Sequence, residues 1–254
     1  MEISKEIIEK AKVTRAFFES KKMLKKYDDI VSSLSKIDYH YTNFNKNYQE
    51  GITQLKKNIF NQVLSEIKDF HFSEDGTKEY FLSVNSLGIR LNQIIFIYEY
   101  DCLIQELKRC VDFTISLLCE IINEDFKKLN SLENFFNGLD GNLSNSSVCC
   151  RILDEQHLEL KNYLLKQWNL WLKEVNISRT NTVHKSIINR VYSSKFEVKW
   201  NSLDKRYIPS EIRLDKLTIK DRPLEEYVSF LNDNIKKFVG YIIRYILKNW
   251  QEND

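Results

Sequence analysis

Glycine and proline are scarce in this chain, which has six Gly and two Pro among its 254 residues. These two residue types supply most of the tight turns that an all-β fold needs, so their scarcity favours long helices. Hydrophobic residues make up 43% of the chain and charged residues 29%, which is the balance of a globular protein with a sizeable core. We therefore predict a mainly α protein.

Three apolar stripes at helical spacing support this prediction, and we interpret each as a face turned toward the core. The first predicts one helix of roughly 40 residues or two collinear helices, and the third begins with Pro223 in its first turn. The stripes comprise Leu91, Ile94, Ile95, Tyr98, Leu103, Leu107, Cys110, Val111, Ile115, Leu118 and Ile122; then Leu158, Leu164, Leu165, Trp168, Trp171, Leu172 and Val175; then Leu224, Val228, Leu231, Ile235, Phe238, Val239, Ile242 and Ile246.

The N-terminal third also has helical patterns, with turn signals between them. An N-terminal helix carries an apolar face, and a second helix is expected over 41–70 with a bend near Gly51. Loops are expected over 71–80, where Asp75 and Gly76 form a turn signal, and over 137–147. The apolar face of the first helix comprises Ile7, Ile8, Ala11, Ala16 and Phe17.

The apolar period changes to two after residue 194. KFEVKW, residues 195–200, alternates like an exposed strand, and 211–220 predicts a second strand whose alternation slips near Asp215, with a turn over 201–210 between them. We predict a single domain over 1–254: a helical bundle of long antiparallel helices, with a small β-hairpin at about 195–220 before the C-terminal helix.

Several classes of protein are disfavoured by missing motifs. Neither a dinucleotide fingerprint nor a P-loop is present, and the four histidines have no metal-site spacing, so we expect no cofactor and no metal. A charged N-terminus and the lack of a long apolar run predict no signal peptide and no membrane span. Five cysteines without a C-x-x-C pair indicate reduced, mostly buried thiols in a cytoplasmic protein.

One stretch, ISRTNTVHKSIINR at 177–190, places Arg179 five positions before His184. We expect Asn176 to end the preceding helix and Ser178 to cap a new one running to about Tyr192. Free amide groups at such a helix start attract anions. Residues 179–248 also hold 15 Lys and Arg against 8 Asp and Glu, which suits an anionic partner.

A second pair, Arg151 and His157, has similar spacing. Asp154 and Glu155 lie between its two members and would repel a phosphate, so we prefer Arg179 and His184. Cys150 lies seven positions before His157, and we interpret that pair as a coincidence and not as a nucleophile with its base.

An arginine followed by a histidine after four to six residues, late in a helical bundle, resembles the HEPN superfamily. The resemblance covers about 85–249 as a core with the hairpin inserted, and leaves 1–80 as a helical extension. It implies a metal-independent endoribonuclease of a toxin–antitoxin or phage-defence system, acting as a homodimer with an antitoxin or other partner protein. Arg179 and His184 would be catalytic, and the supporting or phosphate-binding residues would be Ser178, Thr180, Asn181 and Lys185.

Thr180 departs from the family pattern, which usually has Asn, Asp or His directly after the arginine. Positions five apart also lie about 140° apart around a helix. An inactive HEPN-like domain that binds RNA, a nucleotide or a protein is therefore an alternative. An unrelated helical structural or interaction protein is a further one.

Overall fold

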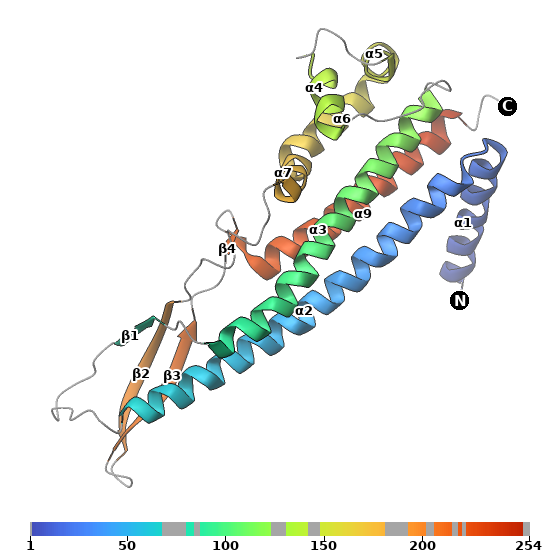
Figure 1. The fold of residues 1–254 in the computed structure, drawn as a ribbon. Coiled ribbons are helices and arrows are strands. Elements are labelled where there is room, and N and C mark those ends of the chain that lie inside the picture. The colour runs from blue at the N-terminus through green and yellow to red at the C-terminus, as the bar shows by residue number, and fades with distance from the viewer. Residues whose placement is uncertain are drawn as a thin grey trace. The chain divides into compact units, whose positions relative to one another are not determined.

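A computed structural model describes residues 2–67, 80–83, 87–122, 131–141, 148–180, 193–201, 206–214, 218–219 and 222–250 (Figure 1). Its helices are α1 (Glu2–Ser20), α2 (Leu24–Ile67), α3 (Leu87–Ile122), α4 (Leu132–Leu139), α5 (Val148–Gln156), α6 (Leu158–Gln167), the π-helical turn η1 (Trp168–Leu172), α7 (Lys173–Thr180) and α9 (Leu224–Trp250). The strands are β1 (Tyr80–Ser83), β2 (Ser193–Asn201), β3 (Arg206–Leu214), β4 (Thr218–Ile219) and β5 (Arg222–Pro223). The protein is mainly α, as predicted.

Two compact units make up the chain. Unit 1 consists of Met1–Tyr39, Cys102–Thr182 and Phe230–Asp254, and unit 2 consists of His40–Asp101 and Val183–Ser229. The long helices α2, α3 and α9 each contribute residues to both units. The predicted boundary between a helical extension and a core from residue 85 stays a prediction.

Contacts within unit 2 show that α2 and α3 run in opposite directions. His40 Nδ1 lies 2.7 Å from Glu99 Oε2, and eight residues further along α2 the Tyr48 ring meets the Phe96 ring at 5.5 Å. Advancing along one helix therefore means moving back along the other (Figure 1). The long helices are antiparallel here, as the sequence predicts.

In the same unit α2 also runs antiparallel to α9. The Tyr41 hydroxyl donates to Ser229 Oγ at 3.4 Å, and Gln49 Nε2 donates to Glu225 Oε2 at 2.9 Å. The partner on α9 thus moves toward its N-terminus as the position on α2 advances.

The predicted apolar stripes of α3 and α9 form the core. From Leu103 to Leu118 every predicted stripe residue of α3 is buried, and so are all eight stripe residues of α9. Tyr98 and Leu158, by contrast, are 63% and 57% exposed, so these two stripe positions were wrongly assigned to the core. Ala11 and Ala16, on the predicted apolar face of α1, are exposed as well. Among the described residues, no helix combines the length and apolar character that crossing a membrane requires.

Two predicted segments have other bounds in the structure, the helix expected over 41–70 and the loop expected over 137–147. The helix expected over 41–70 begins at Leu24 and runs unbroken for 44 residues with Gly51 inside it. A single glycine costs only about 1 kcal/mol in a helix, and the burial of Phe44 and Tyr48 before it helps to offset that cost. The loop expected over 137–147 starts later, because α4 extends to Leu139. Its remainder from 142, and the loop expected at 71–79, lie outside the described residues.

A π-helical turn lies inside the helix formed by α6, η1 and α7. The N–H of Lys173 donates to the carbonyl of Trp168, five residues back. Every fourth residue here is buried, namely Leu160, Leu164, Trp168 and Leu172. In a plain α-helix positions four apart drift by about 40° per step, and the wider turn removes part of that drift.

The predicted hairpin is present as β2 and β3, which pair antiparallel, but β3 begins at Arg206, inside the turn that was expected over 201–210. A register shift after Glu197 leaves Ser210 of β3 as an extra residue beside Pro209, so β3 carries a bulge. The slip expected at Asp215 lies outside the described residues. β1, which the sequence did not predict, pairs with the other edge of β2 and completes a three-stranded sheet.

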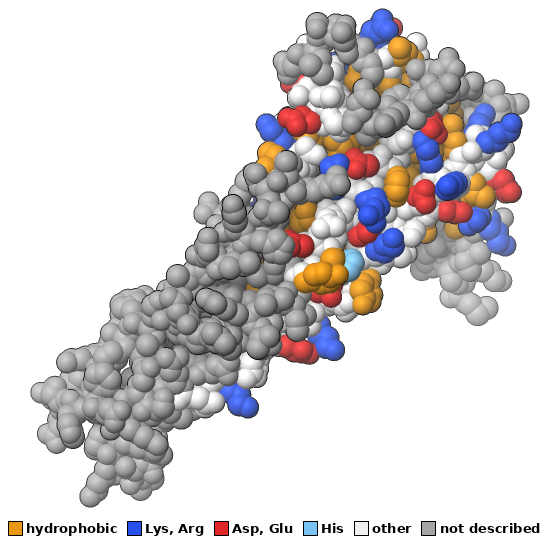
Figure 2. Space-filling view, viewed as in Figure 1, with side chains coloured by type: hydrophobic (Ala, Val, Ile, Leu, Met, Phe, Trp, Pro, Cys, Tyr) orange, Lys and Arg blue, Asp and Glu red, His pale blue; other side chains and the backbone are white. Residues whose placement is uncertain are grey.

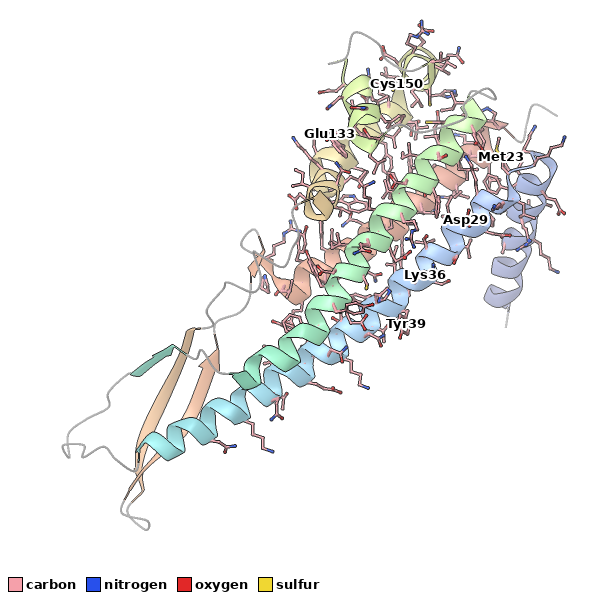
Figure 3. The ribbon with its side chains drawn as sticks, in the orientation of Figure 1. Met23, Asp29, Lys36, Tyr39, Glu133 and Cys150 are labelled. Carbon is pink, nitrogen blue, oxygen red and sulfur yellow. The ribbon has the colours of Figure 1, made fainter. Side chains whose placement is uncertain are left out.

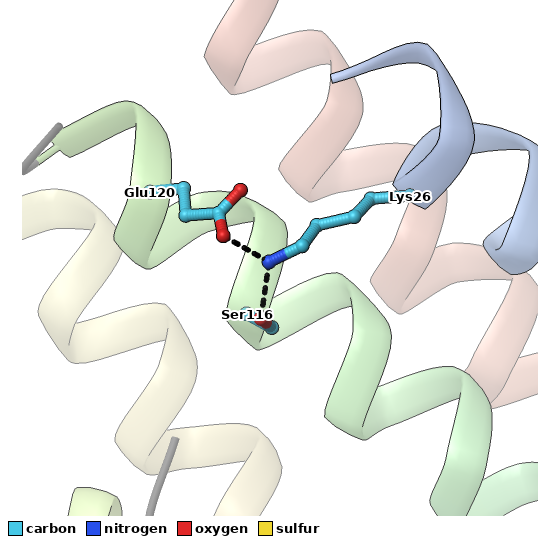
Figure 4. A network of polar contacts seen from close by, with 3 residues as sticks. All are labelled: Lys26, Ser116 and Glu120. Atoms are coloured by element: carbon cyan, nitrogen blue, oxygen red, sulfur yellow. Dashed lines mark hydrogen bonds and ion pairs between the residues drawn. The ribbon is translucent and has the colours of Figure 1, made fainter. Parts of the chain in front are cut away.

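A half-buried polar network in unit 1 ties α2 to α3 (Figure 4). Lys26 Nζ donates to Ser116 Oγ at 2.9 Å and forms an ion pair with the Glu120 carboxylate. The carboxylate and the hydroxyl satisfy one ammonium group together, so the network fixes which faces of the two helices meet.

A Schellman motif ends α1 and turns the chain into α2. The N–H of Met23 donates to the Phe18 carbonyl at 2.8 Å, and that of Lys22 donates to the Glu19 carbonyl at 3.0 Å. Lys22 therefore has a positive φ of 58°, the position at which such motifs usually carry glycine.

We predict that Lys22→Gly raises the free energy of unfolding by about 0.5–1 kcal/mol, because glycine avoids the cost of a left-handed conformation. Lys21→Gly is the matched control, since Lys21 itself has no positive φ to relieve. Denaturant unfolding of both variants measures the difference. Equal or lower stability of Lys22→Gly would contradict this account of the turn.

Candidate functional site

The preferred pair, Arg179 and His184, lies at the edge of the described residues. Ser178, Arg179 and Thr180 form the last described turn of α7. Asn181, His184 and Lys185 lie outside the described residues, so the structure neither joins the pair nor separates it.

The local prediction for this segment was wrong in one respect. The backbone is helical from Lys173 through Thr180, so Asn176 does not end a helix and Ser178 does not cap a new one. Val175 is buried, and the apolar stripe that it continues outweighs the preference of asparagine for a helix end. Arg179 consequently has no free helix-start amides beside it to help hold an anion.

The second pair, Arg151 and His157, is fully described. Arg151 is exposed on α5, whereas His157 follows α5 and faces α9. Its Nδ1 lies 3.0 Å from the Tyr245 hydroxyl, and its ring centroid lies 5.0 Å from that of Trp250. Burial lowers the pKa of His157, so the imidazole is neutral near pH 7.

The carboxylates between this pair are less repulsive than the sequence suggests. Asp154 accepts from Lys161 Nζ at 2.5 Å, so part of its charge is neutralised. Glu155 is exposed. His157 nevertheless serves an aromatic contact between helices, which is a structural role.

The contact extends into a row of half-buried aromatic side chains that the sequence did not predict. The Tyr241 hydroxyl donates to Glu159 Oε1 at 3.1 Å, and the Tyr163 ring stacks on Tyr241 at 3.8 Å. Burial, with a smaller contribution from Tyr241, raises the pKa of Tyr163 to about 12. Tyr241 and Tyr245 are one turn apart on α9, a spacing that could have indicated this row, but its partners on α6 could not be predicted.

Cys150 and His157 do not form a nucleophile and base. Cys150 is buried, and its Sγ lies 3.5 Å from the Phe135 carbonyl. The Nδ1 atom of His157 is already hydrogen-bonded to the Tyr245 hydroxyl. The prediction of mostly buried thiols is confirmed, since only Cys102 is even partly exposed.

The distribution of charged side chains on the described surface tests whether a basic patch is present for the expected anionic partner. On the face shown in Figure 2, basic and acidic side chains are interspersed among the described residues and do not gather in one basic patch. Among all the residues that the structure describes, no group of three His, Cys, Asp or Glu side chains is arranged to hold a metal ion.

Comparison with known proteins gives no family to which the chain can be assigned. No protein-family model, no curated protein and no solved structure matches it. Function therefore has to be argued from the residues themselves.

The neutral state of His157 predicts a pH effect on stability. Its folded pKa lies below the unfolded value of about 6.5, so the unfolded chain binds the extra proton first and stability falls as the pH drops below 6.5. His157→Gln should reduce the fall in Tm between pH 7 and pH 5, measured by thermal unfolding. An unchanged fall would show that this imidazole does not contribute.

Proposed function

We propose that the chain is a HEPN-like, metal-independent endoribonuclease of a toxin–antitoxin or phage-defence system. The proposal rests on one observation, the placement of Arg179 five residues before His184 in the basic C-terminal third. The mainly α fold agrees with the helical architecture that this resemblance implies.

The proposed chemistry is transesterification of RNA. The 2′-hydroxyl attacks the adjacent phosphate, the P–O bond to the next nucleotide breaks, and a cyclic phosphate and a 5′-hydroxyl remain. His184 would take or give the proton, since imidazole titrates near pH 6.5. Arg179 would bind the phosphate and offset the charge that develops on its oxygens.

The helical backbone at Arg179 restricts how the two side chains meet. Continued as an α-helix, positions five apart point about 140° away from each other. Two protomers could instead bring the arginine of one together with the histidine of the other, so we include a homodimer in the proposal. Ser178, Thr180, Asn181 and Lys185 would then line the phosphate site.

Thr180 supports a second candidate, an inactive HEPN-like domain that binds RNA, a nucleotide or a partner protein. The usual polar residue after the arginine is missing there, and α7 offers no helix start at this point. Binding needs only the basic residues, whereas cleavage needs a positioned histidine.

We predict that the purified protein cleaves single-stranded RNA in EDTA and that His184→Ala lowers the rate by roughly 10²–10⁴-fold, the usual contribution of a general acid or base. Gel analysis of a labelled RNA measures the rate. Arg151→Ala is the matched control, because it removes an exposed arginine from the second pair, and its rate should stay unchanged.

Two results separate the candidates. Cleavage that is equally fast in His184→Ala contradicts the ribonuclease proposal. Binding that weakens steeply with salt, without any cleavage product, supports the binding domain, because released counterions make phosphate contacts salt-dependent. A protein that neither binds nor cleaves RNA would favour the third candidate, an unrelated helical interaction protein.

A further inference from the structure

Two cysteines from separate helices meet in the core of unit 1. The Sγ atoms of Cys119 on α3 and Cys149 on α5 lie 3.0 Å apart, with the Cys149 thiol donating to Cys119. Both side chains are fully buried. The hydrogen bond with Cys149, followed by burial, raises the pKa of Cys119 well above its ordinary value, so Cys119 is a protonated thiol in the reduced protein.

The helix that carries Cys149 is short and lies at the surface. α5 has nine residues, with Cys149, Cys150 and Leu153 buried and Val148 and Arg151 exposed. Cys150 can be followed on this helix in Figure 3. A local opening of so short an element costs much less than global unfolding, so a small oxidant can reach Cys149 while α3 stays folded.

We propose that Cys119 and Cys149 are a covalent modification site, which peroxide converts into a disulfide joining α3 to α5. A disulfide needs sulfurs about 2.05 Å apart. From the observed 3.0 Å the two sulfurs must approach by only roughly 1 Å, which side-chain rotation and a slight shift of α5 supply.

The reaction balances with one molecule of hydrogen peroxide. The Cys149 sulfur attacks one peroxide oxygen, the O–O bond breaks, and the leaving hydroxide takes the thiol proton, which yields a sulfenic acid and water. The Cys119 sulfur then attacks the sulfenic sulfur. An S–S bond forms, the S–O bond breaks, and hydroxide leaves with the Cys119 proton as a second water. Peroxide is reduced and the two thiols are oxidised.

The other cysteines are placed less favourably for this reaction. Cys150 Sγ is directed to the Phe135 carbonyl. Cys110 lies nine residues before Cys119 on α3, which separates them by roughly 13 Å along the helix axis. Disulfide formation should therefore be selective for Cys119 and Cys149.

Closing this bond would cross-link positions 30 residues apart and enclose α4 in the loop. A loop of this size restricts the unfolded chain, and we expect Tm to rise by roughly 5–15 °C on oxidation. Reduction with dithiothreitol should reverse the shift. α5 would then be covalently joined to α3 only under oxidising conditions.

The experiment treats the full chain with hydrogen peroxide, blocks remaining thiols and maps cross-linked tryptic peptides by mass spectrometry. Trypsin leaves Cys110 and Cys119 on one peptide and Cys149 and Cys150 on another, so the assignment needs variants. The double variant Cys110→Ser, Cys150→Ser should keep the cross-link and the Tm rise, because it retains only the proposed pair on those peptides.

Cys119→Ala is the matched negative variant and should lose both signals. A wild-type protein that forms no cross-link between these two peptides, or a cross-link that persists in Cys119→Ala, would overturn the proposal. A Tm rise without the cross-link would also count against it. The wild-type cross-link is measured without any variant, and a cross-link in the double variant assigns it to Cys119 and Cys149 even if Cys119→Ala folds poorly. Neither result depends on ribonuclease activity.

Discussion

The apolar stripe of α9 is the constraint on which the described packing depends. Its eight predicted core residues are all buried, and each such side chain contributes roughly 1.5–3 kcal/mol when removed from water. One of them, Phe238, contacts both Tyr163 of α6 and Trp171 of the π-helical turn. On other faces the same helix presents Ser229 to α2 and Tyr245 to His157. One amphipathic helix thereby organises contacts with several others.

Helix existence could be predicted from the sequence because long apolar stripes leave few alternatives. Boundaries could not, because they were inferred from single residues. Gly51 and Asn176 both have weak intrinsic preferences against a helix, and in both places the helix continues past a buried residue that precedes them, Tyr48 and Val175. The strand β1 was missed for the opposite reason, since four residues carry too little pattern to detect.

The candidate site could be predicted only as a motif. The contacts around His157 join residues 88 positions apart, and the Cys119–Cys149 contact joins residues 30 apart. Neither separation follows from a helical period, because both depend on which faces of two helices meet. Spacing along one helix is local information, whereas convergence of side chains is a tertiary property. For Arg179 and His184 the sequence therefore supplies only the residue types. Whether the two side chains meet depends on how the elements that carry them pack.

The π-helical turn has a consequence for how this chain can vary. It holds one residue more than an α-helical turn would need, and the wider turn takes up that residue without turning the helix that follows. Deleting a single residue between Trp168 and Leu172 would therefore restore a plain α-helix and leave α7 facing nearly the same way, with Val175 still in the core. Deleting a residue from the α-helical part of α6 would instead rotate everything after it by about 100°. The π-helical turn is thus a position at which this helix can lose one residue and keep its buried face.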